Sequence, residues 1–265
     1  MCILFIAIGQ HPRYPLIIAA NRDEYHARAR EMMRYWRDAP AILAGRDRVA
    51  GGTWFGVNTR GRIAAVANHR ALSLARGTDA STDGRSRGEL VARFLRGEDS
   101  PAQYADFLRR CRRDFRPFNL LYGTPDRLLC ASSAEARPRE LARGFHSISN
   151  GDLDDPWPKM SRGVSLLREA IAAAEPDCEL DCEKLARAMR DQTQADDALL
   201  PDTGLPRARE KHLSSIFIAD ADYGTRATTL LLAAPGAFEL REYNYAPNGI
   251  AAGTRRYSLQ INPER

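Results

Sequence analysis

The residue with the clearest chemical potential stands at the second position of the sequence. Cys2 becomes the N-terminal residue if Met1 is removed, and aminopeptidases usually remove Met before a small residue such as Cys. The freed α-amino group would titrate near ~7.7–8.0, so it could act as a general base at neutral pH. Nucleophile and base would then belong to one residue, and no histidine would be needed. Taken alone, however, Cys2 is better explained as a buried strand residue beside the start of the chain.

A polar cluster of four residues strengthens the case for chemistry at Cys2. Residues 21–24 read Asn-Arg-Asp-Glu and directly follow the apolar run Leu16–Ala20. A guanidinium from Arg22 near Cys2 would favour the thiolate, and a carboxylate from Asp23 near the α-amino group would orient it. The alternative for this cluster is an ordinary charged turn, which is common in proteins.

The elements that must position these residues follow from the hydrophobic pattern. The apolar runs Cys2–Ile8 and Leu16–Ala20 predict a hairpin whose two faces are both covered. Residues 24–37 are only weakly periodic and predict mixed loop and helix. The pattern elsewhere predicts strands over 51–58, 63–68, 120–122, 128–131, 147–150, 214–219, 227–233 and 238–243, and helices over 87–95, 102–110, 160–174 and 183–192.

This order of elements is not the strict alternation of a doubly wound fold. It predicts an α+β protein in which antiparallel hairpins are covered by helices. No internal repeat or clear linker is present, so we predict one domain over residues 1–265.

Composition limits the class of protein and its partners. The chain has 265 residues, 44% of them hydrophobic and 28% charged, as expected for a globular protein. No apolar run approaches the ~20 residues that span a bilayer, and no basic segment precedes the first apolar run as in a signal peptide. We therefore predict a cytoplasmic protein with no membrane span.

The positive charge and the cysteines carry weaker signals. The net charge is +5, and the densest basic cluster is the arginine-rich segment 109–116. A solvated helix face explains this segment better than a nucleic-acid site, because no aromatic stacking pattern accompanies it.

The five cysteines include no Cys-x-x-Cys pair, so neither a disulfide framework nor a metal site is expected. Cys178 and Cys182 are predicted to be helix residues.

Several motifs together resemble the NRDE family, which is the family of the transport and Golgi organisation protein 2. They are Met-Cys at residues 1–2, Ala-Ala-Asn-Arg-Asp-Glu at 19–24, Gly-Gly-Thr-Trp at 51–54, Ser-Asn-Gly at 149–151 and Tyr-Gly-Thr-Arg at 223–226. The resemblance extends over most of the chain.

A more distant resemblance is to the choloylglycine hydrolase and penicillin V acylase group of N-terminal nucleophile (Ntn) hydrolases. It implies a four-layer αββα fold and cleavage of a linear amide by an N-terminal cysteine. Six positions match in order, namely Cys2, Arg22, Asp23, Asn68, Asn150 and Arg226. The resemblance implies that Cys2 is the nucleophile and Asn150 an oxyanion donor, although that group spaces its Arg and Asp further apart.

The matched asparagines also make physical sense in an acyl-transfer site. Asn68 and Asn150 can each offer N–H donors where negative charge develops on the attacked carbonyl oxygen. Each could equally be an ordinary turn or strand-end asparagine.

Three hypotheses on function stay open on this sequence. The leading hypothesis is a Cys2 hydrolase of the C–N bond of a small linear amide, which requires no cofactor. The alternative, implied by the NRDE resemblance, is a non-catalytic carrier of haem, lipid or acyl-CoA, with Cys2 or His69 as candidate haem ligands. A third and weaker hypothesis is RNA binding through segment 109–116.

Overall fold

Two antiparallel β-sheets with their own helices make up the chain. The computed structural model describes residues 2–70, 84–174 and 179–262. The contacts divide the chain into two compact units, of which the first comprises residues 1–27, 142–149 and 153–258 and the second residues 28–141, 150–152 and 259–265. Each unit holds one sheet and helices that pack on it, so the predicted α+β class is confirmed. The single domain over 1–265 stays a prediction.

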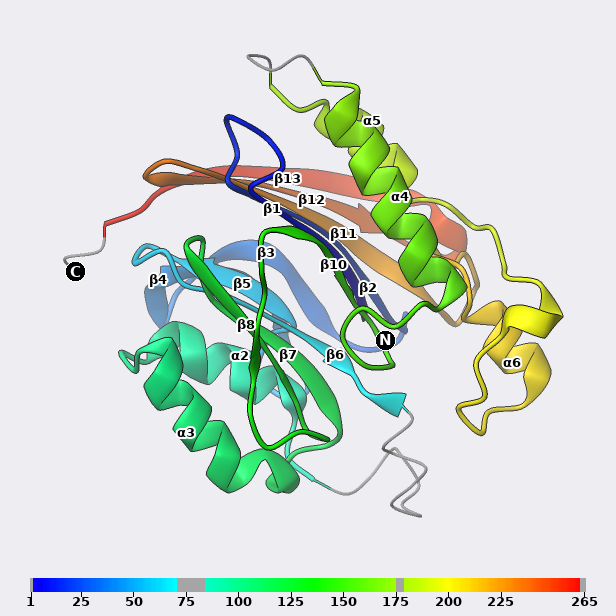
Figure 1. The fold of residues 1–265 in the computed structure, drawn as a ribbon, viewed down its shortest axis with the longest axis horizontal. Helices are drawn as coiled ribbons and strands as arrows, with labels where there is room; N and C mark the ends of the chain where they lie inside the picture. Colours follow the sequence, from blue (N-terminus) through cyan, green and yellow to red (C-terminus); the bar gives the residue numbers. More distant parts are fainter. Residues whose placement is uncertain (1, 71–83, 175–178, 263–265) are drawn as a thin grey trace. The chain divides into compact units, whose positions relative to one another are not determined.

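The first unit is built on a six-stranded sheet in the order β10-β1-β2-β11-β12-β13 (Figure 1). Its strands are β1 (Cys2–Ile8), β2 (Leu16–Tyr25), β10 (Gly144–Ile148), β11 (Tyr223–Ala234), β12 (Ala237–Tyr245) and β13 (Ala251–Gln260). Its helices are α4 (Pro158–Ala172), α5 (Cys182–Ala188) and α6 (Arg207–His212), with 3-10 turns η2 (Asp197–Leu199) and η3 (Pro247–Gly249).

Side-chain alternation gives this sheet two different faces. Ile3, Phe5 and Ala7 of β1 share a buried apolar cluster with residues of α4 and α5, so this face packs on the helices. The fit is close at Gly163 of α4, where an added Cβ would lie 1.9 Å from the ring of Phe5. The opposite face of β1 begins with Cys2. Since β1 is buried almost throughout, both of its faces are covered, as predicted.

The second unit is built on a seven-stranded sheet in the order β3-β4-β5-β6-β7-β8-β9. Its strands are β3 (Arg30–Trp36), β4 (Ala39–Asp47), β5 (Phe55–Asn58), β6 (Ile63–Asn68), β7 (Phe118–Thr124), β8 (Arg127–Ser132) and β9 (Arg139–Glu140). Helices α2 (Arg87–Arg96) and α3 (Pro101–Cys111) and the 3-10 turn η1 (Arg112–Asp114) complete it. Phe94 of α2 and Tyr104 of α3 pack with Tyr122 of β7 in its apolar core.

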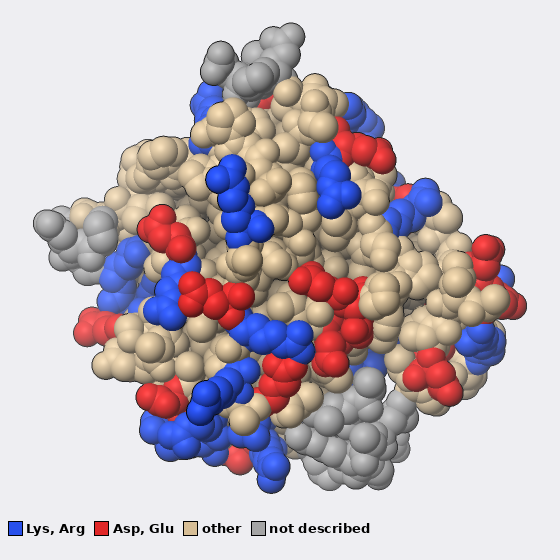
Figure 2. Space-filling model, viewed as in Figure 1, with Lys and Arg blue, Asp and Glu red and all other residues tan. Residues whose placement is uncertain are grey.

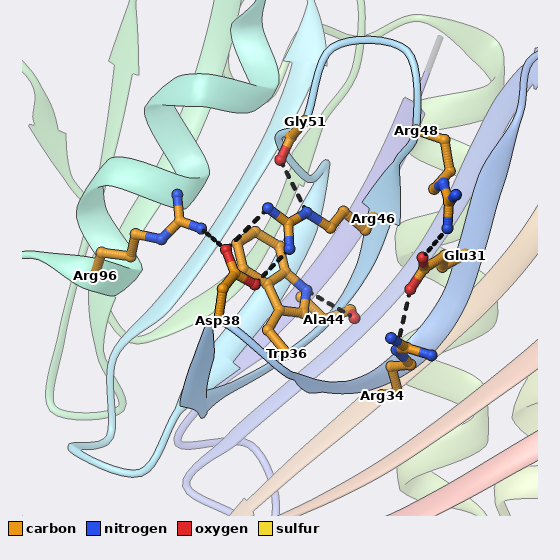
Figure 3. A network of polar contacts seen from close by, with 9 residues as sticks. All are labelled: Glu31, Arg34, Trp36, Asp38, Ala44, Arg46, Arg48, Gly51 and Arg96. Atoms are coloured by element: carbon orange, nitrogen blue, oxygen red, sulfur yellow. Dashed lines mark hydrogen bonds and ion pairs between the residues drawn. The ribbon is translucent and has the colours of Figure 1, made fainter.

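One polar network in this unit surrounds the indole ring of Trp36, and we call it the Trp36 cluster (Figure 3). The guanidinium carbons of Arg46 and Arg96 lie 4.4 and 4.9 Å from the ring centroid. Both arginines also pair with the carboxylate of Asp38, and the indole N–H donates to the carbonyl of Ala44 at 3.2 Å. The cluster therefore ties the β3–β4 hairpin to the C-terminal end of α2.

Two of the predicted elements are wrong. Residues 24–37, predicted as mixed loop and helix, instead complete β2 and form β3. The segment 214–219, predicted as a strand, forms no strand, because its backbone is bonded to other partners. The amide of Phe217 donates to the carbonyl of Asp191 at 2.8 Å, and the amide of Ile218 donates to Oγ1 of Thr225 at 2.9 Å.

The arginine-rich segment 109–116 lies at the end of α3 and in η1, and Arg109, Arg110 and Arg113 are exposed. Figure 2 shows basic side chains gathered over α3, with acidic side chains beside them. No helix within residues 2–70, 84–174 and 179–262 has the length and apolar character needed to cross a membrane.

Candidate active site

Cys2 is held in place by its neighbours at the beginning of β1. It lies directly opposite Arg22 of β2 in the antiparallel register. The hydroxyl of Ser149, just beyond β10, donates to the carbonyl of Cys2 at 3.3 Å. Only 7% of Cys2 is exposed. The sheet therefore fixes the thiol in a buried position.

The environment of the thiol keeps it protonated. Burial raises the pKa of Cys2 to about 11, although the nearby charge of Arg22 acts in the opposite direction. The thiol therefore carries its proton at neutral pH, and any chemistry at Cys2 needs a base to remove it.

Arg22 shares a sheet face with Cys2, because directly opposite residues of paired strands point to the same side. The guanidinium Nη2 is 3.9 Å from a carboxylate oxygen of Glu24, which is too long for a hydrogen bond. Within the part of the chain that the structure describes, Nη1 is buried and has no hydrogen-bond partner. Arg22 thus keeps an unused N–H donor on the thiol's side of the sheet.

Asp23 lies one residue further along β2 and so points to the helix-covered face. Its Oδ1 accepts a hydrogen bond from the Thr225 hydroxyl at 2.7 Å. Burial raises the pKa of this carboxyl, while the hydrogen bond from Thr225 and the charge of Lys159 lower it. Asp23 is thus a fixed, buried carboxyl next to the Cys2–Arg22 pair.

Asn21 has a structural role that sequence reasoning did not assign. It is fully buried, and its Nδ2 donates to the carbonyls of Met189 and Ile216 at 2.8 and 2.9 Å. Its Oδ1 accepts from the Thr228 hydroxyl at 2.7 Å. These bonds tie the segments after α5 and α6 to the sheet. The only sign of this role in the sequence was the asparagine that begins the four-residue motif.

Arg226 lies at a β-bulge of β11, between the paired residues Thr225 and Ala227. It is half-buried, and its Nη1 donates to the carbonyl of Tyr25 at 3.1 Å. The resemblance predicted an arginine before a strand, and the structure places it inside one.

The two predicted asparagines lie together in the second unit. Nδ2 of Asn150 donates to the carbonyl of Asn68 at 3.0 Å, and the amide of Arg70 donates to the carbonyl of Asn150 at 2.8 Å. Nε2 of the buried His69, the candidate haem ligand, lies 3.0 Å from Oδ1 of Asp152. The segment 150–152 is therefore bonded closely to the end of β6.

The six predicted site residues thus form two groups. Cys2, Arg22, Asp23 and Arg226 belong to the first unit, whereas Asn68 and Asn150 belong to the second. The joining of these groups in one site stays a prediction from the resemblance. Within residues 2–70, 84–174 and 179–262, no group of three His, Cys, Asp or Glu side chains could hold a metal ion. Met1 and Cys178 lie outside the described residues.

The fold is that of the Ntn hydrolases. A mutant (C2A) conjugated bile acid hydrolase from Clostridium perfringens superposes with a TM-score of 0.51, covering 100% of this chain and 94% of that chain at 9% sequence identity. At this identity the likeness concerns the fold alone.

The sequence places the chain in a family. The Transport and Golgi organisation 2 family profile matches residues 1–245, so the chain belongs to this family. The Transport and Golgi organization protein 2 homologue of Bos taurus is 31% identical over 252 residues, covering 88% of each chain. The human homologue is 29% identical, with the same coverage. Both predicted resemblances are confirmed.

Proposed function

We propose that this chain is a cysteine amidohydrolase in which Cys2, after removal of Met1, attacks the carbonyl of a small linear amide. The observation that carries the proposal is the Cys2–Arg22 pair. A buried thiol directly opposite a buried guanidinium with an unused N–H is suited to forming a thiolate when its proton is taken.

The base in this proposal is the α-amino group of Cys2 itself. Because burial raises the pKa of the thiol to about 11, the thiol needs a base close by. A free α-amino group is attached to the same Cα, and its ordinary pKa of ~7.7–8.0 leaves much of it unprotonated just above neutral pH. Asp23, fixed by Thr225, orients this amine.

The reaction proceeds in two halves. The amine takes the thiol proton, and the thiolate forms a bond to the amide carbonyl carbon. The C–N bond then breaks, and the leaving amine takes the proton from the α-ammonium group, so that a thioester is left. Water adds to the thioester with the amine as base, the C–S bond breaks, and the thiol regains a proton as the acid leaves.

The developing oxyanion needs preorganised donors. We take from the sequence resemblance that Asn150, with Asn68, supplies them. The hydrogen bond from Asn150 to the carbonyl of Asn68 fixes these two residues relative to each other, which is the kind of rigidity such donors require.

A cleavable N-terminal extension tests the base directly. The protein is produced with an extension that a specific protease removes to leave Cys2 as the first residue, and amine release from a panel of linear acyl amides is measured before and after cleavage. We expect turnover only after cleavage, since the extension converts the α-amine into an amide without basicity. Intact mass confirms which N-terminus is present.

The matched controls are Cys2→Ser and Cys130→Ser, the latter at another buried cysteine, in β8. Cleaved Cys130→Ser should turn over the same amides as the parent, and cleaved Cys2→Ser should not. Equal turnover before and after cleavage, or no turnover of any amide after it, would contradict the proposal.

A carrier of haem, lipid or acyl-CoA is the competing function. For haem, the geometry favours a carrier less than it favours the hydrolase. Nε2 of His69 is already paired with Asp152, and the Cys2 thiol is buried and keeps its proton at neutral pH. Haem titration followed by absorbance distinguishes the two functions. A stoichiometric Soret shift that is lost in Cys2→Ser or His69→Ala would favour the carrier.

A further inference from the structure

The segment that follows β10 forms a closed loop beside Cys2. The hydroxyl of Ser149, one residue past β10, donates to the carbonyl of Cys2 at 3.3 Å. The amide of Asp154 donates to the carbonyl of Ser147 at 3.0 Å, and the amide of Ser147 donates to Oδ1 of Asp154 at 2.7 Å. These two bonds close a loop of residues 148–153, so the position of this loop depends on Asp154.

The backbone of Asp154 has a conformation that needs support from its surroundings. Its φ is 61°, in the left-handed region that is uncommon for residues other than glycine. Such a conformation persists where the contacts around it fix it. One carboxylate oxygen of Asp154 is bonded to the amide of Ser147, and the other lies 2.8 Å from Nδ1 of His146. His146 is therefore one of the groups that hold Asp154 in this conformation.

Both ring nitrogens of His146 are used. Nδ1 lies 2.8 Å from Oδ2 of Asp154, and Nε2 lies 2.8 Å from the carbonyl oxygen of Ala142. Carboxylate and carbonyl oxygens accept hydrogen bonds, so the ring must donate from both nitrogens. Only the imidazolium, which carries a proton on each nitrogen, can make both bonds. The hydrogen bond to Asp154 raises the pKa of His146, although burial acts in the opposite direction.

The neighbouring elements use their charged side chains elsewhere. β1, which pairs with β10, has no acidic or basic side chain. Arg168 of α4 lies 4.9 Å from the ring of Phe145, which points to the opposite face of β10 from His146. The side chain of Arg143 lies beside the residue that follows β1. The charge that acts on the imidazole is that of Asp154.

We propose that His146, as an imidazolium, is a positioning residue that holds Asp154 and with it this loop, and that the loop loosens when His146 loses its proton at higher pH. A neutral ring has one N–H, so the bond to Asp154 or the bond to Ala142 is then lost. For catalysis, this inference rests on the proposed function, in which the loop carries Asn150 and bonds to the carbonyl of Cys2.

The proposed base and His146 should act on the rate in opposite directions as the pH rises. The α-amine of Cys2 must be unprotonated, so turnover rises through its ordinary pKa of ~7.7–8.0. His146 must be protonated. Its contribution is complete below its ordinary pKa, near ~6.5, and is lost as the pH rises through the raised pKa of the folded state. We therefore expect a bell-shaped profile of kcat whose alkaline limb reports His146.

The role of His146 in the fold is tested first, without substrate, in the full-length protein. An NMR titration of the His146 ring should give a pKa above the ordinary value, and Asp154→Asn should lower it because a neutral amide replaces the carboxylate. Hydrogen exchange is measured at the amides of Ser147 and Asp154 and corrected for the intrinsic effect of pH. Their protection should fall about tenfold as the pH rises through the pKa of His146.

Two histidine variants then test the effect on catalysis. His146→Gln keeps a side-chain donor that does not titrate, so the alkaline limb of kcat should disappear. Its kcat near pH ~6 should be about tenfold below that of the wild type with KM little changed, because the loop acts on the transition state. His212→Gln is the matched control, since His212 also lies near a carboxylate, 3.5 Å from that of Asp220. Its profile should follow the wild type.

The same measurements on Asp154→Asn keep the inference testable if His146→Gln does not fold. The lowered pKa of His146 should move the alkaline limb of kcat to lower pH. The inference is overturned if His146 titrates at or below its ordinary pKa, or if the protection of the loop amides does not change with its titration.

The outcomes also separate this inference from the hydrolase. The expected titration and hydrogen exchange, with no turnover of any amide by the processed protein, would support the role of His146 in the loop and contradict the hydrolase. Turnover with an alkaline limb that is the same in His146→Gln as in the wild type would support the hydrolase and overturn the positioning role.

Discussion

The Cys2 end of the first unit and the Trp36 cluster of the second unit both contain arginine. They differ in how many of the guanidinium N–H groups have a hydrogen-bond or ion-pair partner. Around Trp36, two guanidiniums lie against the ring and both pair with Asp38. Beside Cys2, Arg22 has one long ion pair and a buried Nη1 with no partner among the described residues. A cluster whose polar groups are satisfied stabilises the fold, whereas a buried donor without a partner costs stability unless a water or a ligand accepts its hydrogen bond.

The largest effect that would sharpen this contrast is expected at Cys2. Cys2→Ala in the processed protein should lower kcat/KM by about a thousandfold or more, equivalent to ~4 kcal/mol of transition-state stabilisation. The melting temperature should change little, because a buried thiol is replaced by a smaller apolar group. Kinetics on an amide that the wild type cleaves, with thermal unfolding in parallel, measures both. A variant with wild-type turnover would exclude Cys2 as the nucleophile.

The opposite pattern is expected at Trp36. Trp36→Ala empties a large buried site and removes the ring on which two arginines lie, so the free energy of unfolding should fall by about 3–5 kcal/mol. Turnover per folded molecule should stay the same. Chemical denaturation measures the free energy of unfolding, and active-site titration gives the turnover per folded molecule. A loss of turnover without a loss of stability would contradict the contrast between Trp36 and Cys2.

Arg22 should behave like Cys2 rather than like Trp36, with a smaller effect. Arg22→Met keeps most of the side-chain volume but removes the charge, so kcat/KM should fall by about 10–100-fold. Stability should be unchanged or higher, because a buried donor without a partner is removed. Denaturation midpoints and kinetics on the same preparation check this. Marked destabilisation would show that Arg22 supports the fold.

The pH dependence at Asp23 gives a smaller effect. Burial raises the pKa of this carboxyl in the folded protein. The free energy of unfolding therefore falls as the pH rises from the ordinary pKa of the carboxyl, near ~4, through its raised pKa in the folded state. Asp23→Asn removes this loss. The variant should melt at a higher temperature than the wild type near pH ~8 and at the same temperature near pH ~3, below both pKa values. A gain that does not depend on pH would contradict this assignment.

The smallest effect is expected at Asp38. The carboxyl is exposed and paired with Arg46 and Arg96, and Arg46 holds its pKa below the ordinary value. Asp38→Asn should lower the melting temperature slightly at low ionic strength, and the difference should disappear in high salt because exposed ion pairs are screened. Thermal unfolding over a salt series measures it, and a large effect independent of salt would be unexpected.

The sequence predicted the elements around Cys2 better than those further along the chain. The continuous apolar runs of β1 and β2 indicated a hairpin covered on both faces, and the polar cluster fell at the end of β2. Segment 30–36 was missed because arginine, glutamate and methionine stand where a half-buried strand usually alternates. Segment 214–219 is apolar enough for a strand, but its amides bond to Asp191 and Thr225, which no local pattern indicates.

The candidate site was predictable only in part, for a physical reason. Residues that the resemblance covers, such as Cys2 and Arg22, could be named, and their pairing follows from the first hairpin. The partners of Asn21 could not be placed, because Met189 and Ile216 lie 168 and 195 residues further along the chain. Among the described residues, the lack of a partner for Nη1 of Arg22 becomes visible only when the whole sheet is assembled.

The bulge at Arg226 adds one residue to β11 between two residues that pair with β2. Before it, Thr225 pairs with Asp23 on the helix-covered face; after it, Ala227 pairs with Arg22 on the other. Because Arg226 is the one extra residue of the bulge, Thr225 and Ala227 would become consecutive without it and would keep the faces on which they now lie. We therefore expect the deletion of residue 226 to remove the bulge and to leave Thr229 on the face of Cys2 and Leu230 on the helix-covered face.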